Sequence, residues 1–280
     1  MSALETKTTS VSALREASSA APGRKRELLA QGIMVVAFVV LWEAVGRGDF
    51  VYGLIPTFSD TLVGVWSIVT SSTIGRQISI SSYEIGAGLG VAIVAGVAVG
   101  LALGSVDYLR KVFEPLITYV AAFPKIVMFP VFLLLFGVGP ESKLAMGAVS
   151  GFVPIVLNVL VAMRSIDDKY IKMARSLGTT RLQMYRKIYL PGMVYPIIAG
   201  IRLGTGLAIV GALLGEIKVS NGGLGWLAHF YLAQFSIPKM YAVLAIIFLG
   251  AVAINLVLSL ILARFTRFKA SELAEATPLM

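Results

Sequence analysis

The 280-residue sequence contains no cysteine and a single histidine, His229. A disulfide, a cysteine-ligated metal and a thiol nucleophile are therefore excluded, and so is a site built from several histidines. Charged residues are also scarce: they make up 14% of the chain, against about 25% in a typical soluble domain. A surface with so few charges is not suited to water, so the sequence predicts a polytopic membrane protein.

Apolar residues are abundant, at 57% of the chain, and they occur in long blocks. Six blocks reach or approach the roughly 20 residues that a membrane-spanning helix needs. The segment "LIPTFSDTLVGVWSIV" between the first two blocks is amphipathic and begins with Ser and Asp capping candidates, which predicts a short interfacial helix. The sequence therefore predicts an all-α membrane protein with six transmembrane helices, at residues 28–45, 78–104, 112–136 (interrupted by Pro124 and Pro130), 144–163, 193–217 and 240–263.

The two ends of the chain are predicted to be tails that flank a transmembrane domain at residues 28–268. Residues 1–27 are rich in Ser, Thr and Ala, which predicts a disordered tail, and residues 269–280 form a second tail. Most Lys and Arg residues lie in these tails and in the loops after the second and fourth spans. The positive-inside rule therefore places both termini in the cytoplasm, and it accounts for the net charge of +9 without a nucleic-acid partner.

Small residues recur at four-residue spacing within the predicted spans. This spacing favours close packing of helices in lipid, where the fit of the backbones drives association. No internal repeat is evident, which argues against a secondary transporter built from inverted repeats. The glycines concerned are Gly96, Gly100 and Gly104, then Gly200 with Gly204, and Gly211 with Gly215.

The longest predicted cytoplasmic loop, residues 164–191, has the pattern of two short helices joined by a glycine. The first helix is predicted from about residue 167 to Leu177, and Gly178 offers the left-handed conformation that ends a helix. Thr180 and Gln183 then have the spacing of a capping box. Pro191 is suited to the first turn of the next span.

The second of these helices is predicted to be amphipathic. Its apolar side chains are Leu182, Tyr185, Ile188 and Tyr189, and its basic side chains lie largely on the other face. Such a helix could lie on an anionic bilayer surface or fill a groove on a cytoplasmic partner. The residues alone leave both interpretations open.

The stretch Met173-Ala174-Arg175-Ser176-Leu177-Gly178, followed by Ile188-Tyr189-Leu190-Pro191, resembles the cytoplasmic "EAA" loop of binding-protein-dependent ABC-importer permeases. Over about residues 28–265 the chain looks most like the nitrate/sulfonate/taurine-type permeases. Supporting segments are "PVFLLLFGVGPESK", "IRLGTGLAIVGALLGEI" and "SNGGLGWL". Two positions depart from the pattern: Lys172 stands where the motif has Glu, and Glu84 stands where many relatives have a basic residue.

This resemblance implies the type I (MetI-like) permease fold in a bacterial inner membrane. It implies a loop that acts as a coupling helix in a groove of a separate ATP-binding subunit. It also implies two ATPase copies, a second copy of the permease and an external binding protein as partners. The residues implied for coupling are Met173, Ala174, Arg175, Leu177, Gly178, Leu182, Tyr185, Ile188, Leu190 and Pro191.

The chain has no nucleotide-binding loop of its own. A P-loop needs a Gly-Lys-Ser/Thr sequence to hold phosphates, and no Gly in this chain is followed by Lys. We therefore expect no catalytic residues, no metal and no cofactor in this chain, with ATP and its Mg²⁺ bound by the partner. The alternative function is a secondary transporter or a channel that is not coupled to ATP.

Several charged residues fall within predicted spans, where charge is costly and usually faces the protein interior. Lys125 and Arg202 place positive charge near the membrane centre, and Glu84 could pair with either of them. One interpretation is structural ion pairing. The other is a lined route that favours a small anion such as nitrate or a sulfonate. The candidate pathway residues are Lys125, Arg202, Glu84 and Glu216.

Overall fold

The computed structural model describes residues 24–48, 53–164, 166 and 168–275. Secondary structure in these ranges is helical, with no strand among them. The chain divides between Leu62 and Val63 into two compact units, which are described separately. The prediction of an all-α fold is confirmed.

The first unit contains the first apolar helix and the start of a short helix. Helix α2 spans Arg24–Arg47, so helical structure begins within the predicted tail, and residues 1–23 lie outside the described residues. Near its end the carboxylate of Glu43 accepts from Arg47 Nε at 2.8 Å and from the backbone N–H of Ser59 at 3.1 Å. Helix α3, Phe58–Val69, confirms the predicted short helix. Its cap is Thr57, whose Oγ1 accepts from the N–H of Asp60 at 3.0 Å.

The second unit contains most of the long apolar helices. These are α4 (Ile74–Gly104), α7 (Pro140–Arg164), α10 (Leu190–Lys218) and α12 (Ile237–Glu275). With α2, five helices of the described chain are long and apolar enough to cross a membrane, or six if one bent pair counts as a span. Helix α12 continues into the predicted C-terminal tail, because Ala, Leu, Glu and Lys there all favour helix. Residues 276–280 lie outside the described part of the chain.

The bent pair lies where the sequence predicted an interrupted third span. Helix α5 spans Asp107–Ala122, a 3₁₀ turn spans Lys125–Met128, and α6 spans Phe129–Phe136, with a bend of 86°. Pro124 precedes the turn in extended conformation, so the predicted break there is confirmed. Pro130 does not interrupt the helix, because it lies in the first turn of α6, where a missing N–H leaves no hydrogen bond unmade.

Close packing of α4, α7 and α10 forms the centre of the second unit, with α7 in contact with both neighbours. A Cβ added at Gly100 would lie 2.6 Å from Val159 Cβ, and one added at Gly96 would lie 2.8 Å from Ile155 Cγ2. Both distances are too short for real atoms, so only glycine permits this approach. Ile155 and Val159 are fully buried as a result. The predicted packing role of these glycines is confirmed.

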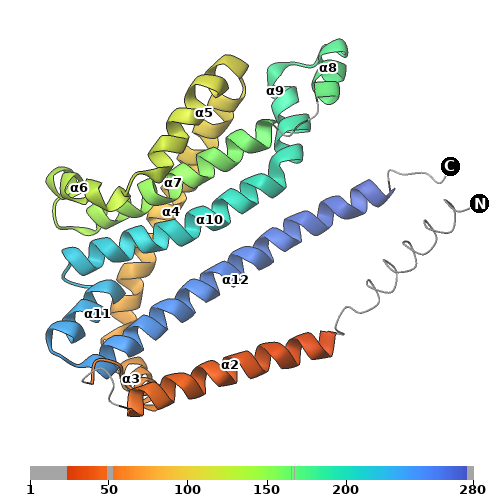
Figure 1. The fold of residues 1–280 in the computed structure, drawn as a ribbon. Helices are drawn as coiled ribbons and strands as arrows, with labels where there is room; N and C mark the ends of the chain where they lie inside the picture. The colour runs from red at the N-terminus through yellow and green to blue at the C-terminus, as the bar shows by residue number, and fades with distance from the viewer. Residues whose placement is uncertain (1–23, 49–52, 165, 167, 276–280) are drawn as a thin grey trace, which may run out of the picture. The chain divides into compact units, whose positions relative to one another are not determined.

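Shorter helices lie at the two opposite ends of this bundle (Figure 1). Helices α8 (Asp168–Ser176) and α9 (Arg181–Met184) lie at the end where α7 finishes and α10 begins. A π-helical turn, Tyr185–Tyr189, joins α9 to α10. Helix α11, Leu224–Ala233, lies at the other end, after α10, and packs on α10 and α12. The two ends therefore present different loops to the two sides of a membrane.

Labelling of single cysteines tests which end faces the cytoplasm. Because the chain has no native cysteine, a probe at exposed Ser176 (α8) or exposed Asn221 (before α11) is unambiguous. We expect an impermeant maleimide to label Asn221→Cys in intact cells, and Ser176→Cys only after permeabilisation, since the basic loop should remain inside. Labelling of both positions from one side would contradict the predicted topology.

Candidate functional site

The first candidate site is the basic segment, residues 168–191, in which α8 ends at a hydrogen-bonded turn around Gly178. Gly178 has φ of +66°, in the left-handed region. The N–H of Thr179 donates to Ala174 O at 3.2 Å, and the N–H of Gly178 donates to Arg175 O at 3.0 Å. These two bonds are the pair that defines a Schellman motif. The predicted glycine stop is therefore confirmed.

The helix that follows begins with the predicted capping box. The N–H of Gln183 donates to Thr180 Oγ1 at 3.3 Å, and the N–H of Thr180 donates to Gln183 Oε1 at 2.9 Å. Both bonds satisfy donors that the start of a helix otherwise leaves unpaired. Two hydrogen-bonded ends therefore fix the direction of the chain on each side of Gly178.

The apolar side chains of the basic segment divide into an inner and an outer group. The rings of Tyr185 and Tyr189 lie 5.4 Å apart with a tilt of 42° between their planes, and both pack against the buried cluster around Met193. Met173, Leu177 and Leu182 instead are 59%, 74% and 67% exposed. The sequence predicted Leu182 on the same face as the two tyrosines. Leu182 lies in the first turn of α9, one turn farther from α10 than Tyr185, and faces outward, so this part of the prediction is wrong.

The outer group lies among basic side chains. Lys172, Arg175, Arg186 and Lys187 are all exposed, whereas Ala174 is 3% exposed and packs inward. Three exposed apolar residues surrounded by positive charge form a surface that suits a partner with an apolar groove and an acidic rim. The coupling role of these residues, and of Ile188, Leu190 and Pro191, stays a prediction.

A second candidate site is a buried cluster of charges at the other end of the bundle. Glu84 of α4, Lys143 of α7 and Glu216 of α10 are 2%, 1% and 1% exposed. Lys143 Nζ donates to the carbonyl oxygens of Val138 and Gly139. The two carboxyl groups lie against each other. One oxygen of each, Glu84 Oε2 and Glu216 Oε1, accepts no hydrogen bond from the residues that the structure describes.

Glu216 of this cluster and two polar residues of α4 hold the start of α11 in place. Gly225 N–H donates to Glu216 Oε2 at 2.7 Å, Gly223 N–H donates to Gln77 Oε1 at 2.7 Å, and Leu224 N–H donates to Ser81 Oγ at 2.7 Å. Three otherwise unpaired N–H groups of a helix start are satisfied in this way. The "SNGGLGWL" segment is therefore hydrogen-bonded to side chains of both α4 and α10.

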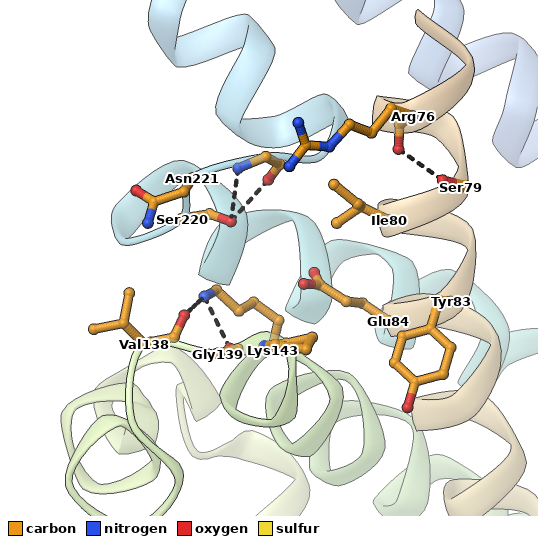
Figure 2. A pocket seen from close by; sticks show the side chains of 12 residues that line it. Arg76, Ser79, Ile80, Tyr83, Glu84, Val138, Gly139, Lys143, Ser220 and Asn221 are labelled. Atoms are coloured by element: carbon orange, nitrogen blue, oxygen red, sulfur yellow. Dashed lines mark hydrogen bonds between the residues drawn. The ribbon is translucent and has the colours of Figure 1, made fainter. Parts of the chain in front are cut away.

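A cavity of about 490 Å³ lies beside the charge cluster (Figure 2). Its walls come from α4, from the turn before α7 and from the turn after α10. Glu84 points into it from α4, while Lys143 turns its amino group toward Val138 (Figure 2). The charged and polar residues that line the cavity are Arg76, Ser79, Tyr83, Glu84, Lys143, Ser220 and Asn221.

The structure separates the four predicted pathway residues into two sets. The carboxyl groups of Glu84 and Glu216 lie beside each other. Within the described residues, neither acid forms an ion pair with Lys125 or Arg202. The prediction that Glu84 pairs with one of these bases is therefore wrong. Lys125 Nζ donates to Ala121 O at 2.7 Å, and Arg202 Nη2 donates to Ser259 Oγ at 2.7 Å.

The base near Glu84 is Lys143, because α7 begins at Pro140 and carries Lys143 into the bundle. The missed signal was a lysine directly before a long apolar run.

Residues 88–270, more than half of the chain, match the family described as "Binding-protein-dependent transport system inner membrane component". The chain belongs to this family. It is a multi-pass inner-membrane transport permease.

Curated permeases from several bacteria are similar over most of this permease. A putative aliphatic sulfonates transport permease of Bacillus subtilis is 27% identical over 76% of this chain and 78% of its own. The riboflavin transport permease of Chloroflexus aurantiacus is 31% identical over 59% of this chain and 62% of its own. The taurine transport permease of Escherichia coli is 28% identical over 63% of this chain and 65% of its own. Their solutes differ, so similarity alone does not assign one here.

A solved structure supports the fold. The inward-facing MetNI methionine ABC transporter has a chain that superposes with a TM-score of 0.58 at 19% identity, over 71% of this permease and 98% of that chain. The predicted type I permease fold is confirmed.

Proposed function

We propose that this permease is the membrane-spanning subunit of an ATP-binding-cassette importer driven by a separate ATPase. The observation that carries the proposal is the basic segment. Its helix ends are fixed by hydrogen bonds on both sides of Gly178, its tyrosines are packed into the bundle, and Met173, Leu177 and Leu182 project outward. A segment held rigidly at its base with exposed apolar residues at its tip can transmit a displacement between a partner and the spans.

The proposed assembly contains two permease copies, two ATPase subunits and an external binding protein that delivers the solute. Membership of the family and the fold of the methionine importer support these partners. The test is co-expression of this permease with the candidate ATPase, followed by purification and measurement of ATP hydrolysis in proteoliposomes. Stoichiometric co-purification and hydrolysis stimulated by the loaded binding protein are expected. A permease that transports its solute without ATP would instead support the secondary-transporter alternative.

The solute is proposed to be small and to carry an acidic group, as sulfonates and nitrate do. The support is the positive charge within the spans. Arg202 on α10 is exposed and bonded to the uncharged hydroxyl of Ser259, and Lys125 is bonded to backbone carbonyls. Neither base is neutralised by an acid among the described residues. Exposed positive charge beside a low-dielectric route favours an anionic group.

Replacement of each base tests this proposal. We expect Lys125→Met or Arg202→Met to lower solute uptake at least tenfold in proteoliposomes while the protein accumulates at its normal level. The control is Lys218→Met, which removes an exposed lysine in the last turn of the same helix as Arg202. Uptake that falls only in proportion to lost protein in both variants would mean that the two bases are structural.

A further inference from the structure

A second cavity, of about 420 Å³, lies at the end of the bundle opposite the charge cluster. Its walls come from the end of α4, the start of α5, the end of α7 and one side of α8. The volume lies in the range usual for small-molecule sites. The charged residues that the structure describes in its lining are five bases, Arg110, Lys111, Arg164, Lys172 and Arg175, and one acid, Asp107.

Part of this positive charge is already compensated within the protein. Arg110 Nη2 lies 2.8 Å from Asp107 Oδ1, and Arg164 Nη1 lies 3.9 Å from Glu114 Oε1. Helices α4 and α7 both end at the cavity, and their C-terminal carbonyl groups together offset about one further positive charge. About two of the five positive charges therefore have no counterpart among the residues that the structure describes.

The bases without a counterpart come from two separate helices. Lys111 belongs to α5, whereas Lys172 and Arg175 belong to α8, where a spacing of three residues puts them on one helix face. All three are exposed and line the cavity, and none of them forms an ion pair with an acid that the structure describes. Positive charges held around one cavity repel one another, and an anion between them would be attracted by all of them. The cavity is therefore suited to an anionic ligand.

The residue types indicate which anion fits. Arginine presents a planar fork of N–H groups that matches the oxygens of a phosphate, and lysine binds phosphate as a point charge. Tyr189 also lines the cavity, and its phenolic O–H is a further donor. The positive-inside rule predicts that this end of the bundle lies at the cytoplasmic surface, where basic pockets between spans bind the head groups of anionic phospholipids. A phosphate group therefore suits both the lining and the location.

We propose that this cavity binds an anionic phosphate group, held by Lys111 of α5 together with Lys172 and Arg175 of α8. The phosphate comes either from the head group of an anionic lipid in the surrounding bilayer or from free phosphate in the cytoplasm. A group bound there connects α8 to the end of the bundle, so its presence should restrict the displacement of the basic segment relative to the spans. The site goes beyond the proposed function and does not depend on the identity of the solute.

The melting temperature of the purified full-length permease tests the proposal with two pairs of probes at matched ionic strength. The first pair is inorganic phosphate and chloride. The second pair is dihexanoyl-phosphatidylglycerol, which is anionic, and dihexanoyl-phosphatidylcholine, which is zwitterionic. At a hundredfold excess over its dissociation constant, a bound probe is expected to raise the melting temperature by on the order of 5 °C. Chloride and phosphatidylcholine should produce a much smaller shift, and a larger shift with phosphatidylglycerol than with phosphate identifies the lipid as the source.

Two double variants test where the phosphate group binds. Lys111→Gln/Lys172→Gln removes two bases of the cavity at exposed positions, so it should fold normally and lose most of the shift. The matched control is Arg186→Gln/Lys187→Gln, which removes two exposed bases from the π turn before α10. Neither of these two residues lines the cavity, so the control should retain the full shift.

Three outcomes would overturn the proposal. One is a response to phosphate and phosphatidylglycerol that is no larger than the response to chloride and phosphatidylcholine. Another is an equal loss of the shift in both double variants, which would mean that the probes respond to surface charge in general. The third is a full shift in Lys111→Gln/Lys172→Gln or, if that protein does not fold, in the single variant Lys172→Gln. Binding is measured without the ATPase and without a solute, so a failure of the proposed coupling would not affect these results.

Discussion

Replacement of Gly178 by valine is expected to lower binding-protein-stimulated ATP hydrolysis at least tenfold while membrane insertion of the permease remains normal. Gly178 adopts φ of +66°, and a Cβ there would meet no atom within 4 Å. The penalty is therefore in the backbone and not in a steric clash. The left-handed conformation costs an L-residue about 1–2 kcal/mol, and a β-branched side chain tolerates it least. The chain should relax by changing direction between α8 and α9, which would displace Leu182 from its partner.

The matched control is Gly178→Asn, since asparagine adopts the left-handed region more readily than other side chains. This variant should retain most of the stimulated hydrolysis, although it adds a larger side chain at the same position. The measurement is ATP hydrolysis in proteoliposomes with and without the loaded binding protein. Full stimulation in Gly178→Val would argue against the coupling role of the basic segment.

Local chemistry explains which features could be predicted from the sequence. The glycine stop at Gly178, the capping box of Thr180 and Gln183 and the break at Pro124 each depend on a few consecutive residues. The structure confirms all three. The glycine spacing in α4 was also readable, because helical periodicity puts Gly96 and Gly100 on one face.

Features that depend on tertiary packing could not be predicted in this way. Glu84, Lys143 and Glu216 come from three helices, and only the close contact of α4, α7 and α10 brings them together. Lys143 was assigned to a loop because the apolar run begins one residue later. The position of Leu182 was missed because periodicity says which residues share a helix face, but not how far along the helix the bundle reaches to cover that face.

Replacement of Lys143 by methionine is expected to destabilise the permease more than any surface substitution. Lys143 is 1% exposed, it attracts both Glu84 and Glu216, and it donates to the carbonyls of Val138 and Gly139. Methionine fills a similar volume but leaves two buried carboxyls without their base and two carbonyls without a donor. Removal of one partner from a buried charge cluster typically costs about 3–5 kcal/mol. We expect low accumulation and a melting temperature lowered by roughly 5–10 °C.

The double variant Lys143→Met/Glu84→Gln separates charge from shape. It has the same net charge in the cluster as the wild type, so it should recover a large part of the lost stability if uncompensated carboxylate is the cause. Lys218→Met, which removes an exposed lysine from α10, should have no measurable effect. If the single and double variants melt together, the loss comes from the carbonyls of Val138 and Gly139, and charge compensation is not what Lys143 contributes. A Lys143→Met protein as stable as the wild type would contradict both explanations, because neither the carboxyls nor the carbonyls would then depend on this amino group.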